Sequence, residues 1–336
     1  MRQIVTILCA CLMISGVNFA EAKSKKELKP SQTILLYPEG QAAGKGLPET
    51  EGPLVSNGYT AEQEVRAENG NLTCTGDNAR MEIYTPKKPN GQMVIVCPGG
   101  GYWKVAAALE GLHVAEWMVE RGITVCVLIY RVAEKKWEIP LQDVQNAFRY
   151  CRAHAADWGV NQIGVMGFSA GGHLAACASN LYVDDITRPD FSVLIYPVTS
   201  FDRMYVKNGT RDKLIGKLGE WDSKEGRTMK EWEAAQAKVT ELIAQYSMVN
   251  HISAQTPTAF LACSKDDKGV PVEHSLSYYS KLVENGVSAE MHIYPSGGHG
   301  WGFGYERFDP KGKDKFAYAR SEFEASLERW LEGIRK

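Results

Sequence analysis

A serine placed between a strand pattern and a helix pattern limits the possible folds of this chain more than any other part of the sequence. Residues 167–171 read Gly-Phe-Ser-Ala-Gly, a G-x-S-x-G pentad centred on Ser169. Apolar residues precede the pentad at 163–166, and a helix-like run follows at 174–178. In this setting the serine occupies a sharp, strained turn that exposes its hydroxyl at the end of a sheet, and glycines leave room for close backbone. The pentad therefore predicts a nucleophilic serine. A tight strand–helix connection without chemistry is the alternative.

Continuous apolar runs alternate with helical patterns along most of the chain. The runs that predict strands are 93–97, 125–129, 163–166, 193–196, 259–262 and 291–294, with alternating edge-type patterns at 72–75 and 81–84. The patterns that predict helices are 112–119, 141–158, 274–283 and 316–334. Runs that are apolar on both faces are typical of buried parallel strands. We therefore expect residues 71–336 to form a doubly wound α/β domain with a mostly parallel sheet, which binds ligands beyond the carboxyl ends of its strands.

Three segments fall outside this alternation. Residues 1–22 combine Arg2, an apolar run and a small-x-small cleavage site ending at Ala22, which predicts a secretory signal and an exported protein, periplasmic or secreted. Residues 23–70 predict an irregular N-terminal segment. The polar residues at about 201–250, with a helix-like stretch at 229–246, form an insertion. We expect it to be a small cap over the active site, with a surface excursion as the alternative.

Composition excludes several classes of function. The 336 residues carry a formal net charge of −2 and contain no basic run, so no nucleic-acid partner is expected. After residue 22 no stretch is long enough to span a bilayer. No metal-ligand spacing or dinucleotide fingerprint is present, so we expect neither a metal nor another cofactor. Six cysteines follow residue 22, and we expect free, buried thiols, with a disulfide left open: 74, 97, 126, 151, 177 and 263.

A serine nucleophile needs a general base and an acid that orients the base. In chains with this type of serine turn the acid follows the serine and the histidine follows the acid. Asp267 and His299 each come shortly after an apolar strand pattern, and His299 lies in a glycine-rich loop. The predicted catalytic residues are therefore Ser169, Asp267 and His299. Asp266 remains an alternative acid, and the Asp184-Asp185 pair is a weaker one.

The oxyanion of an acyl-transfer intermediate needs backbone N–H donors near the serine. Three glycines at 99–101 directly follow the strand pattern that ends at Cys97. In this arrangement one donor comes from that loop and another is the amide after the nucleophile. The predicted donors are the amides of Gly100, Gly101 and Ala170.

These motifs together resemble the α/β-hydrolase serine esterases of the bacterial acetyl xylan esterase and feruloyl esterase type, from about Asn90 to the C-terminus. The matching pieces are 96–102, 110–111, 128–132, 164–176, 267–271 and 297–301. The resemblance implies the α/β-hydrolase fold, the same Ser169, Asp267 and His299 set, an exported setting and carbohydrate esters as substrates. The chain departs from the family pattern at Pro98, where a histidine is usual, and at residues 217–237, which look like extra sequence.

Substrate contacts are expected from side chains beside the catalytic loops. Tyr102, Trp103 and Trp301 flank these loops, and their aromatic faces suit a sugar ring or an aryl acyl group. Phe303 also flanks these loops. For each of these aromatic residues the alternative is packing within the loop itself. Glu110 and Arg131 could bond sugar hydroxyls or each other.

The expected activity is a serine carboxylesterase that removes acetyl or other small acyl groups from a plant polysaccharide such as xylan. The alternatives are a feruloyl esterase, a prolyl-oligopeptidase-like serine peptidase, an esterase for non-carbohydrate substrates, and an inactive carbohydrate-binding protein. The few residues before position 93 leave too little chain for a propeller domain, which disfavours the peptidase.

Overall fold

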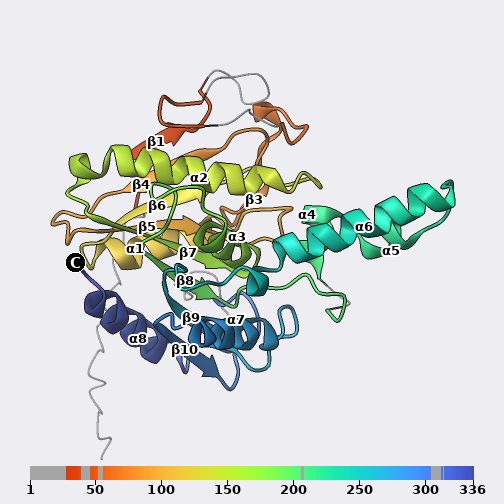
Figure 1. Cartoon of the computed structure of the whole chain (residues 1–336). Coiled ribbons are helices and arrows are strands. Elements are labelled where there is room, and N and C mark those ends of the chain that lie inside the picture. The colour runs from red at the N-terminus through yellow and green to blue at the C-terminus, as the bar shows by residue number, and fades with distance from the viewer. Residues whose placement is uncertain (1–27, 39–45, 52–55, 206–207, 304–311, 313) are drawn as a thin grey trace, which may run out of the picture.

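The apolar runs form the centre of an eight-stranded sheet in a computed structural model that describes residues 28–38, 46–51, 56–205, 208–303, 312 and 314–336 (Figure 1). The strand order is β1-β4-β6-β5-β7-β8-β9-β10. Strand β4 runs antiparallel to β1 and β6, and the other neighbours are parallel. The bounds are β1 (Gln32–Leu35), β4 (Arg80–Tyr84), β5 (Gln92–Cys97), β6 (Thr124–Ile129), β7 (Gln162–Phe168), β8 (Phe191–Ile195), β9 (Thr258–Ser264) and β10 (Ala289–Tyr294).

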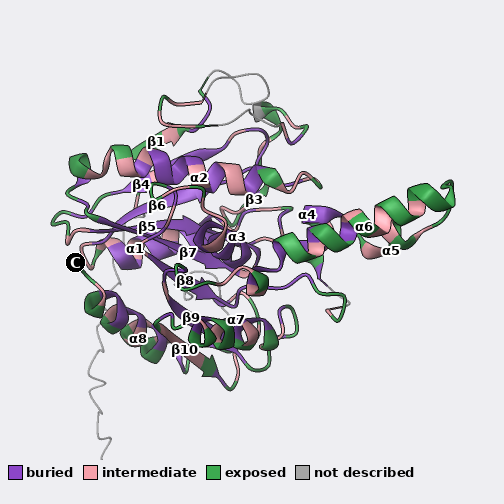
Figure 2. Cartoon of the chain, viewed as in Figure 1, coloured by how far each residue is buried: buried purple, intermediate pink, exposed green. Residues whose placement is uncertain are grey.

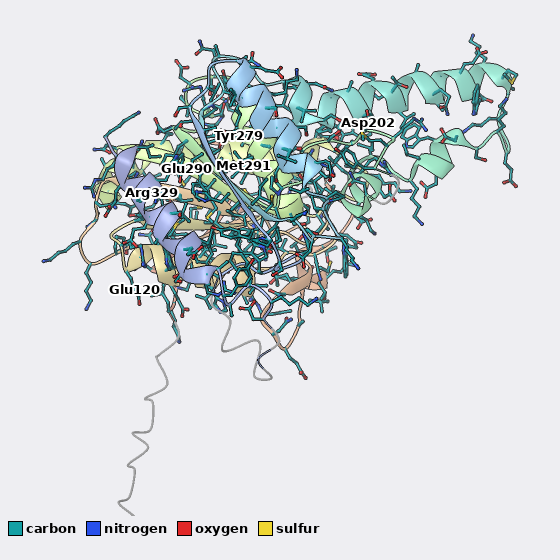
Figure 3. The ribbon with its side chains drawn as sticks, turned by 90° about the horizontal axis from the view of Figure 1, so that it is seen from below. Glu120, Asp202, Tyr279, Glu290, Met291 and Arg329 are labelled. Atoms are coloured by element: carbon teal, nitrogen blue, oxygen red, sulfur yellow. The ribbon has the colours of Figure 1, made fainter. Side chains whose placement is uncertain are left out.

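Helices cover both faces of the sheet. Helices α1 and α8 lie on one face, while α2, α3 and α7 lie on the other (Figures 1 and 3). Figure 3 shows Arg329 of α8 beside Glu290 of β10, and their ion pair is 2.6 Å long. The bounds are α1 (His113–Val119), α2 (Glu138–Ala153), α3 (Ser169–Asn180), α4 (Gly209–Ile215), α5 (Leu218–Asp222), α6 (Met229–Tyr246), α7 (Glu273–Glu284) and α8 (Arg320–Gly333).

The central strands are buried on both faces, which explains their uninterrupted apolar sequence. Every residue of β5, β6 and β7 is buried, and Figure 2 shows this core running along the sheet. The chain winds first from β5 to β6 and later from β5's other side to β7 and β8, so the winding direction reverses at β5. In doubly wound sheets, ligands bind beyond the carboxyl ends of the strands at such a reversal.

The prediction of an irregular segment over residues 23–70 is wrong at β1. This strand pairs with the outer side of β4, from Gln32 opposite Ile83 to Leu35 opposite Arg80. Its four residues are too few, and too exposed at the sheet edge, to show a clear pattern. The same segment holds a 3₁₀ turn (Ala61–Gln63) and β2 (Val65–Arg66), which pairs with β3 (Leu72–Cys74) in a separate two-stranded sheet.

Some helix boundaries also differ from the sequence patterns. The pattern at 141–158 is divided into α2 and a 3₁₀ turn (Ala155–Trp158), and the pattern at 316–334 becomes helical only at Arg320. The pattern at 112–119 is α1 preceded by a turn of π-helix, η2 (Ala108–Leu112). The helix-like stretch at 229–246 coincides with α6.

The insertion at 201–250 forms an arm. It contains α4, α5, α6 and the 3₁₀ turn η4 (Met248–Asn250), and α5 with the outer part of α6 projects away from the sheet in both views (Figures 1 and 3). No residue of α5 is buried, and in α6 only Val239, Leu242 and Tyr246 are. The outer part has the form of a surface excursion. The insertion packs on the domain through α4, where Leu214 and Ile215 are buried, and through the inner end of α6.

Three further expectations concern the whole chain. The six cysteines are unpaired, five of them buried and Cys74 half-buried. No helix within the described ranges is long and apolar enough to cross a membrane. The predicted signal segment 1–22 lies outside the described residues.

Candidate active site

Ser169 stands at a sharp turn between β7 and α3. Its φ angle is +54°, in the left-handed region that side chains rarely adopt. Gly167 and Gly171 make this turn possible, since a Cβ atom on Gly171 would lie 2.0 Å from the carbonyl oxygen of Cys97 and one on Gly167 would lie 2.0 Å from that of Gly171. A strained residue at the switch point of the sheet is a mark of a functional site.

This close approach leads to a stability prediction. Replacing Gly171 with alanine is expected to destabilise the protein by about 3 kcal/mol or more, because the new methyl group meets rigid backbone. Gly219→Ala is the matched control: no atom lies within 4 Å of its added Cβ, and alanine in α5 is favoured by up to about 1 kcal/mol. Thermal unfolding of both variants tests this, and equal melting temperatures would contradict the packing argument.

His299 connects Ser169 to Asp267 through two short hydrogen bonds. Its Nε2 lies 2.8 Å from Ser169 Oγ, and its Nδ1 lies 2.7 Å from Asp267 Oδ2. An ionised carboxylate can only accept, so Nδ1 carries the proton and Nε2 is free to accept from the serine hydroxyl. The Asp267 side chain is fully buried, whereas the His299 side chain is 30% exposed and can meet a ligand.

The structure distinguishes the two candidate acids. The second oxygen of Asp267, Oδ1, accepts the N–H groups of Gly269 and Val270 at 2.7 and 2.9 Å, which aims the carboxylate at His299. Asp266 instead accepts the amide of Gly298 at 2.8 Å and so holds the loop of His299. The weaker alternative, Asp184, bonds Thr187 and Arg149.

The glycine loop after β5 lies against the serine. A Cβ atom on Gly99 would lie 3.1 Å from the Cβ of Ser169. Gly100 and Gly101 have φ angles of +133° and +66°, and no hydrogen bond between described residues uses either amide as donor. The amide of Ala170 lies in the first turn of α3, where N–H groups have no acceptor within the helix. The N–H groups of the three predicted donors therefore make no hydrogen bond to a described backbone acceptor.

Two of the three predicted substrate contacts are wrong. Tyr102 is 1% exposed, and its hydroxyl lies 2.9 Å from Nδ1 of His173. Trp301 is 4% exposed, stacks on Phe316, and donates its ring N–H to Ser264 at 3.1 Å. Both rings pack in the core beneath the catalytic loops, and these contacts hold the loops in place. Trp103 is 47% exposed and is the one of the three that a substrate can reach.

His173 is the buried, hydrogen-bonded histidine that the sequence predicts. Burial lowers its pKa to about 4, so the ring is neutral. Its Nε2 donates to the carbonyl of Tyr246 at 2.7 Å, and its Nδ1 accepts the hydroxyl proton of Tyr102. The ring therefore joins the loop after β5 to the inner end of α6.

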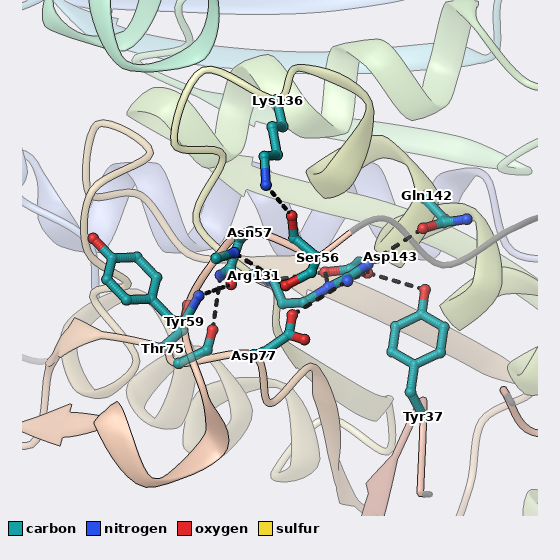
Figure 4. Close-up of polar contacts among 12 residues, drawn as sticks. Tyr37, Ser56, Asn57, Tyr59, Thr75, Asp77, Arg131, Lys136, Gln142 and Asp143 are labelled. Carbon is teal, nitrogen blue, oxygen red and sulfur yellow. Dashed lines mark hydrogen bonds and ion pairs between the residues drawn. The ribbon is translucent and has the colours of Figure 1, made fainter. Parts of the chain in front are cut away.

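Arg131 has a structural role. Its guanidinium lies between Asp143, at 2.6 Å, and Asp77, at 3.4 Å, and Tyr37 donates its hydroxyl to Asp143 from the other side (Figure 4). Arg131 and Asp143 have no exposed side-chain surface. This buried cluster explains Arg131 without a sugar hydroxyl.

Glu110 and Tyr196 are hydrogen-bonded to each other beside the catalytic residues. Glu110 is buried rather than open to a sugar hydroxyl, and it accepts the hydroxyl proton of Tyr196 at 2.7 Å. Tyr196 is not among the residues predicted from the sequence, yet its ring centre lies 4.9 Å from that of His299. Its place directly after β8, at the carboxyl edge of the sheet, was the available signal.

The residues described in the structure contain no group of three or more His, Cys, Asp or Glu side chains arranged to hold a metal ion.

Known proteins resemble this chain in sequence. The model of the BD-FAE family matches residues 81–282. An acetylxylan esterase of Xylanibacter ruminicola is 36% identical over 238 residues, which are 70% of this chain and 46% of that protein. Endo-1,4-beta-xylanase B of Butyrivibrio fibrisolvens is 27% identical over 225 residues, which are 62% of this chain and 32% of that protein. The chain thus spans less than half the length of these two relatives.

Solved structures resemble it in fold. An acetyl ester-xyloside bifunctional hydrolase from Caldicellulosiruptor lactoaceticus has a TM-score of 0.61 and 27% identity, covering 92% of this chain and 98% of that one. The carboxylesterase Cest-2923 from Lactobacillus plantarum has a TM-score of 0.60 and 20% identity, covering 82% and 99%. Since the family model matches more than half of the chain and the sheet, serine turn and solved structures agree, this chain has the α/β-hydrolase fold and belongs to the BD-FAE family.

Proposed function

We propose that this chain is a serine carboxylesterase that removes acetyl or other small acyl groups from a plant polysaccharide such as xylan. The observation that carries the proposal is the unbroken hydrogen-bond chain from Ser169 through His299 to Asp267. The similarity to an acetylxylan esterase supports a carbohydrate ester as the substrate. The exposed ring of Trp103 beside the glycine loop offers an apolar face for the sugar.

The first half of the reaction transfers the acyl group to the enzyme. Ser169 Oγ attacks the ester carbonyl while Nε2 of His299 takes the hydroxyl proton. The negative charge that forms on the carbonyl oxygen is received by the amides of Gly100, Gly101 and Ala170, each worth about 2.7–4 kcal/mol to the transition state. His299 then gives its proton to the departing sugar oxygen, which leaves as a hydroxyl group.

The second half releases the acyl group by the same route. His299 takes a proton from a water molecule, whose oxygen attacks the acyl carbon. When the intermediate collapses, the proton passes from His299 back to Ser169 Oγ, and acetate leaves. Asp267 keeps the proton on Nδ1 throughout and stabilises the imidazolium.

The test is acetate release from acetylated xylo-oligosaccharides, beside ferulate release from a feruloylated oligosaccharide. Acetate release that depends on Ser169 supports the proposal. Ferulate release without acetate release would mean that the enzyme removes an aryl acyl group rather than an acetyl group. Cleavage of an aminoacyl-proline reporter would favour a peptidase. If a fluorophosphonate labels Ser169 but no carbohydrate ester is cleaved, the polysaccharide part of the proposal is wrong.

The two aspartates provide a prediction for the acid. Asp267→Asn is expected to lower kcat about 10⁴-fold, because an amide at this position favours the wrong tautomer of His299. Asp266→Asn is the matched control and keeps an oxygen that can accept the amide of Gly298, so we expect less than about a 10-fold loss. Steady-state kinetics on p-nitrophenyl acetate measures both. Equal losses of kcat in the two variants would mean that Asp267 is not the acid that orients His299.

We also propose that residues 1–22 direct export to the periplasm or the medium and are then removed. The apolar run and the small residues around Ala22 support this. N-terminal sequencing of the protein recovered from a bacterial periplasm tests it. A mature chain that begins at Lys23 is expected, and a chain that keeps residues 1–22 would contradict it.

A further inference from the structure

Glu110 is a buried carboxylate directly behind the glycine loop. Its Oε2 accepts the N–H of Gly99 at 2.7 Å, and its Oε1 accepts the hydroxyl proton of Tyr196 at 2.7 Å. The Tyr196 oxygen in turn accepts the N–H of Gly302 at 2.9 Å. Gly99 precedes the predicted oxyanion donors, and Gly302 follows His299 by three residues. One carboxylate therefore joins the loop that receives the oxyanion to the loop that carries the base.

The backbone brings Glu110 to this position at a cost in regular geometry. Residues 108–112 form a turn of π-helix, and such turns are rare and occur mostly at functional sites. The contacts around the carboxylate are close: a Cβ atom on Gly99 would lie 2.6 Å from Oε2, and one on Gly302 would lie 3.4 Å from the Cγ of Glu110. Both loops thus pack closely on Glu110, and a side chain at position 99 would meet its carboxylate.

The hydrogen bonds suit an ionised Glu110. Both of its partners donate, and a carboxylate accepts twice whereas a neutral carboxyl group would have to place a proton of its own. Burial raises the pKa of Glu110 overall, and the bonds from Tyr196 and Gly99 and the nearby charges of His299 and Lys104 oppose this rise in favour of the ionised form. Tyr130 also faces this carboxylate. Among the described residues no lysine or arginine forms an ion pair with Glu110, so its charge acts on the site itself.

The charge lies close to the base. Tyr196, which bonds Glu110, has its ring centre 4.9 Å from that of His299 and 4.8 Å from that of Trp301. Tyr196 adopts a φ angle of +37°, a strained conformation that directs this side chain under the catalytic histidine. His299 becomes positively charged when it takes the serine proton, and a buried negative charge nearby stabilises that form.

We propose that Glu110 is a positioning residue. Its carboxylate fixes the glycine loop after β5 relative to the loop that carries His299, and its charge stabilises the His299 imidazolium. The inference rests on the proposed esterase function. It replaces a contact between Glu110 and the sugar, because the side chain is buried and both oxygens are occupied within the protein.

The test compares Glu110→Gln with Tyr196→Phe. Glutamine keeps the shape and one acceptor oxygen but loses the charge, and phenylalanine keeps the ring beside His299 but loses the bridge to Gly302. We expect each to lower kcat about 10- to 100-fold with little change in KM, less than the 10²–10³-fold loss of an oxyanion donor itself. The double variant is expected to lose less than the product of the two, since both break one network. Glu233→Gln, on the exposed part of α6, is the control and is expected to match wild type.

The pH profile separates positioning from a merely structural role. In Glu110→Gln the acid limb of kcat/KM is expected to move to lower pH, because removing a negative charge makes protonation of His299 less favourable. Tyr196→Phe keeps the carboxylate and is expected to shift the limb less. An unshifted limb, with activity lost only in proportion to folded protein by circular dichroism, would overturn the inference. So would wild-type kcat in Glu110→Gln.

Labelling of Ser169 by a fluorophosphonate distinguishes this inference from the proposed function. The reagent needs the serine, the base and the oxyanion donors but no carbohydrate ester. If wild type is labelled yet cleaves no acetate ester, the proposed substrate is wrong, and slower labelling of Glu110→Gln than of Glu233→Gln still supports the role of Glu110. Equal labelling rates in the two variants would overturn it.

Discussion

Replacing Ser169 with alanine is expected to abolish ester hydrolysis and leave the fold intact. Removal of a nucleophilic serine from such a set lowers kcat by roughly 10⁵–10⁶-fold, because the remaining donors can only assist attack by water. The hydroxyl bonds His299, and loss of one partly exposed hydrogen bond changes the free energy of unfolding by about 1 kcal/mol or less. The strained φ angle of +54° is the same for alanine as for serine, so the turn itself is retained.

The measurement is acetate release together with thermal unfolding. Ser321→Ala is the matched control, because Ser321 lies exposed on α8, and it is expected to match wild type in both assays. A folded Ser169→Ala protein that keeps more than roughly a thousandth of wild-type activity would mean that another group is the nucleophile.

Replacing Asp143 with alanine is expected to lower the free energy of unfolding by about 3–5 kcal/mol, the cost of removing the nearer carboxylate from a buried guanidinium and leaving only Asp77, at 3.4 Å. Asp143 accepts from the backbone N–H of Arg131 at 2.9 Å, from its guanidinium at 2.6 Å, and from Tyr37 at 3.0 Å (Figure 4). Neither charged side chain is exposed, so water cannot take the place of the carboxylate. The cluster joins the segment after β1 to the start of α2, and its loss loosens the sheet edge near β4.

An exposed ion pair of similar length supplies the control. Lys135 and Glu220 lie 2.7 Å apart with side chains 57% and 50% exposed, and Glu220→Ala is expected to cost less than about 1 kcal/mol. Urea unfolding of both variants measures the difference. Similar losses in the two would show that burial does not govern the strength of the Arg131 cluster.

Much of the site could be predicted from local sequence. The serine turn, the acid and the histidine each follow a strand, and the carboxyl ends of parallel strands meet at one edge of the sheet. The order of Ser169, Asp267 and His299 along the chain then limits the set to a few candidates. Local sequence did not distinguish Asp266 from Asp267, because adjacent residues in a loop differ only in the direction of their side chains.

The side chains around this set were harder to predict. Tyr102 and Trp301 are neighbours of catalytic residues in sequence, yet both rings point into the core, where they meet His173 and Phe316. Their partners come from α3 and from the segment before α8, which are distant in sequence. Whether an aromatic ring in a loop faces a ligand or the core depends on those partners and leaves no local pattern.

The strand–helix alternation, the type of sheet and the edge where the catalytic residues lie could all be read from the sequence, because they depend on periodicity and on residues that adopt special backbone angles. Three features became visible only in the folded molecule: Glu110 and Tyr196 join two catalytic loops, Arg131 lies between two aspartates, and the insertion projects as an arm. These features depend on contacts between separate segments of the chain. A charged or aromatic side chain that such contacts bury binds other protein groups instead of a ligand.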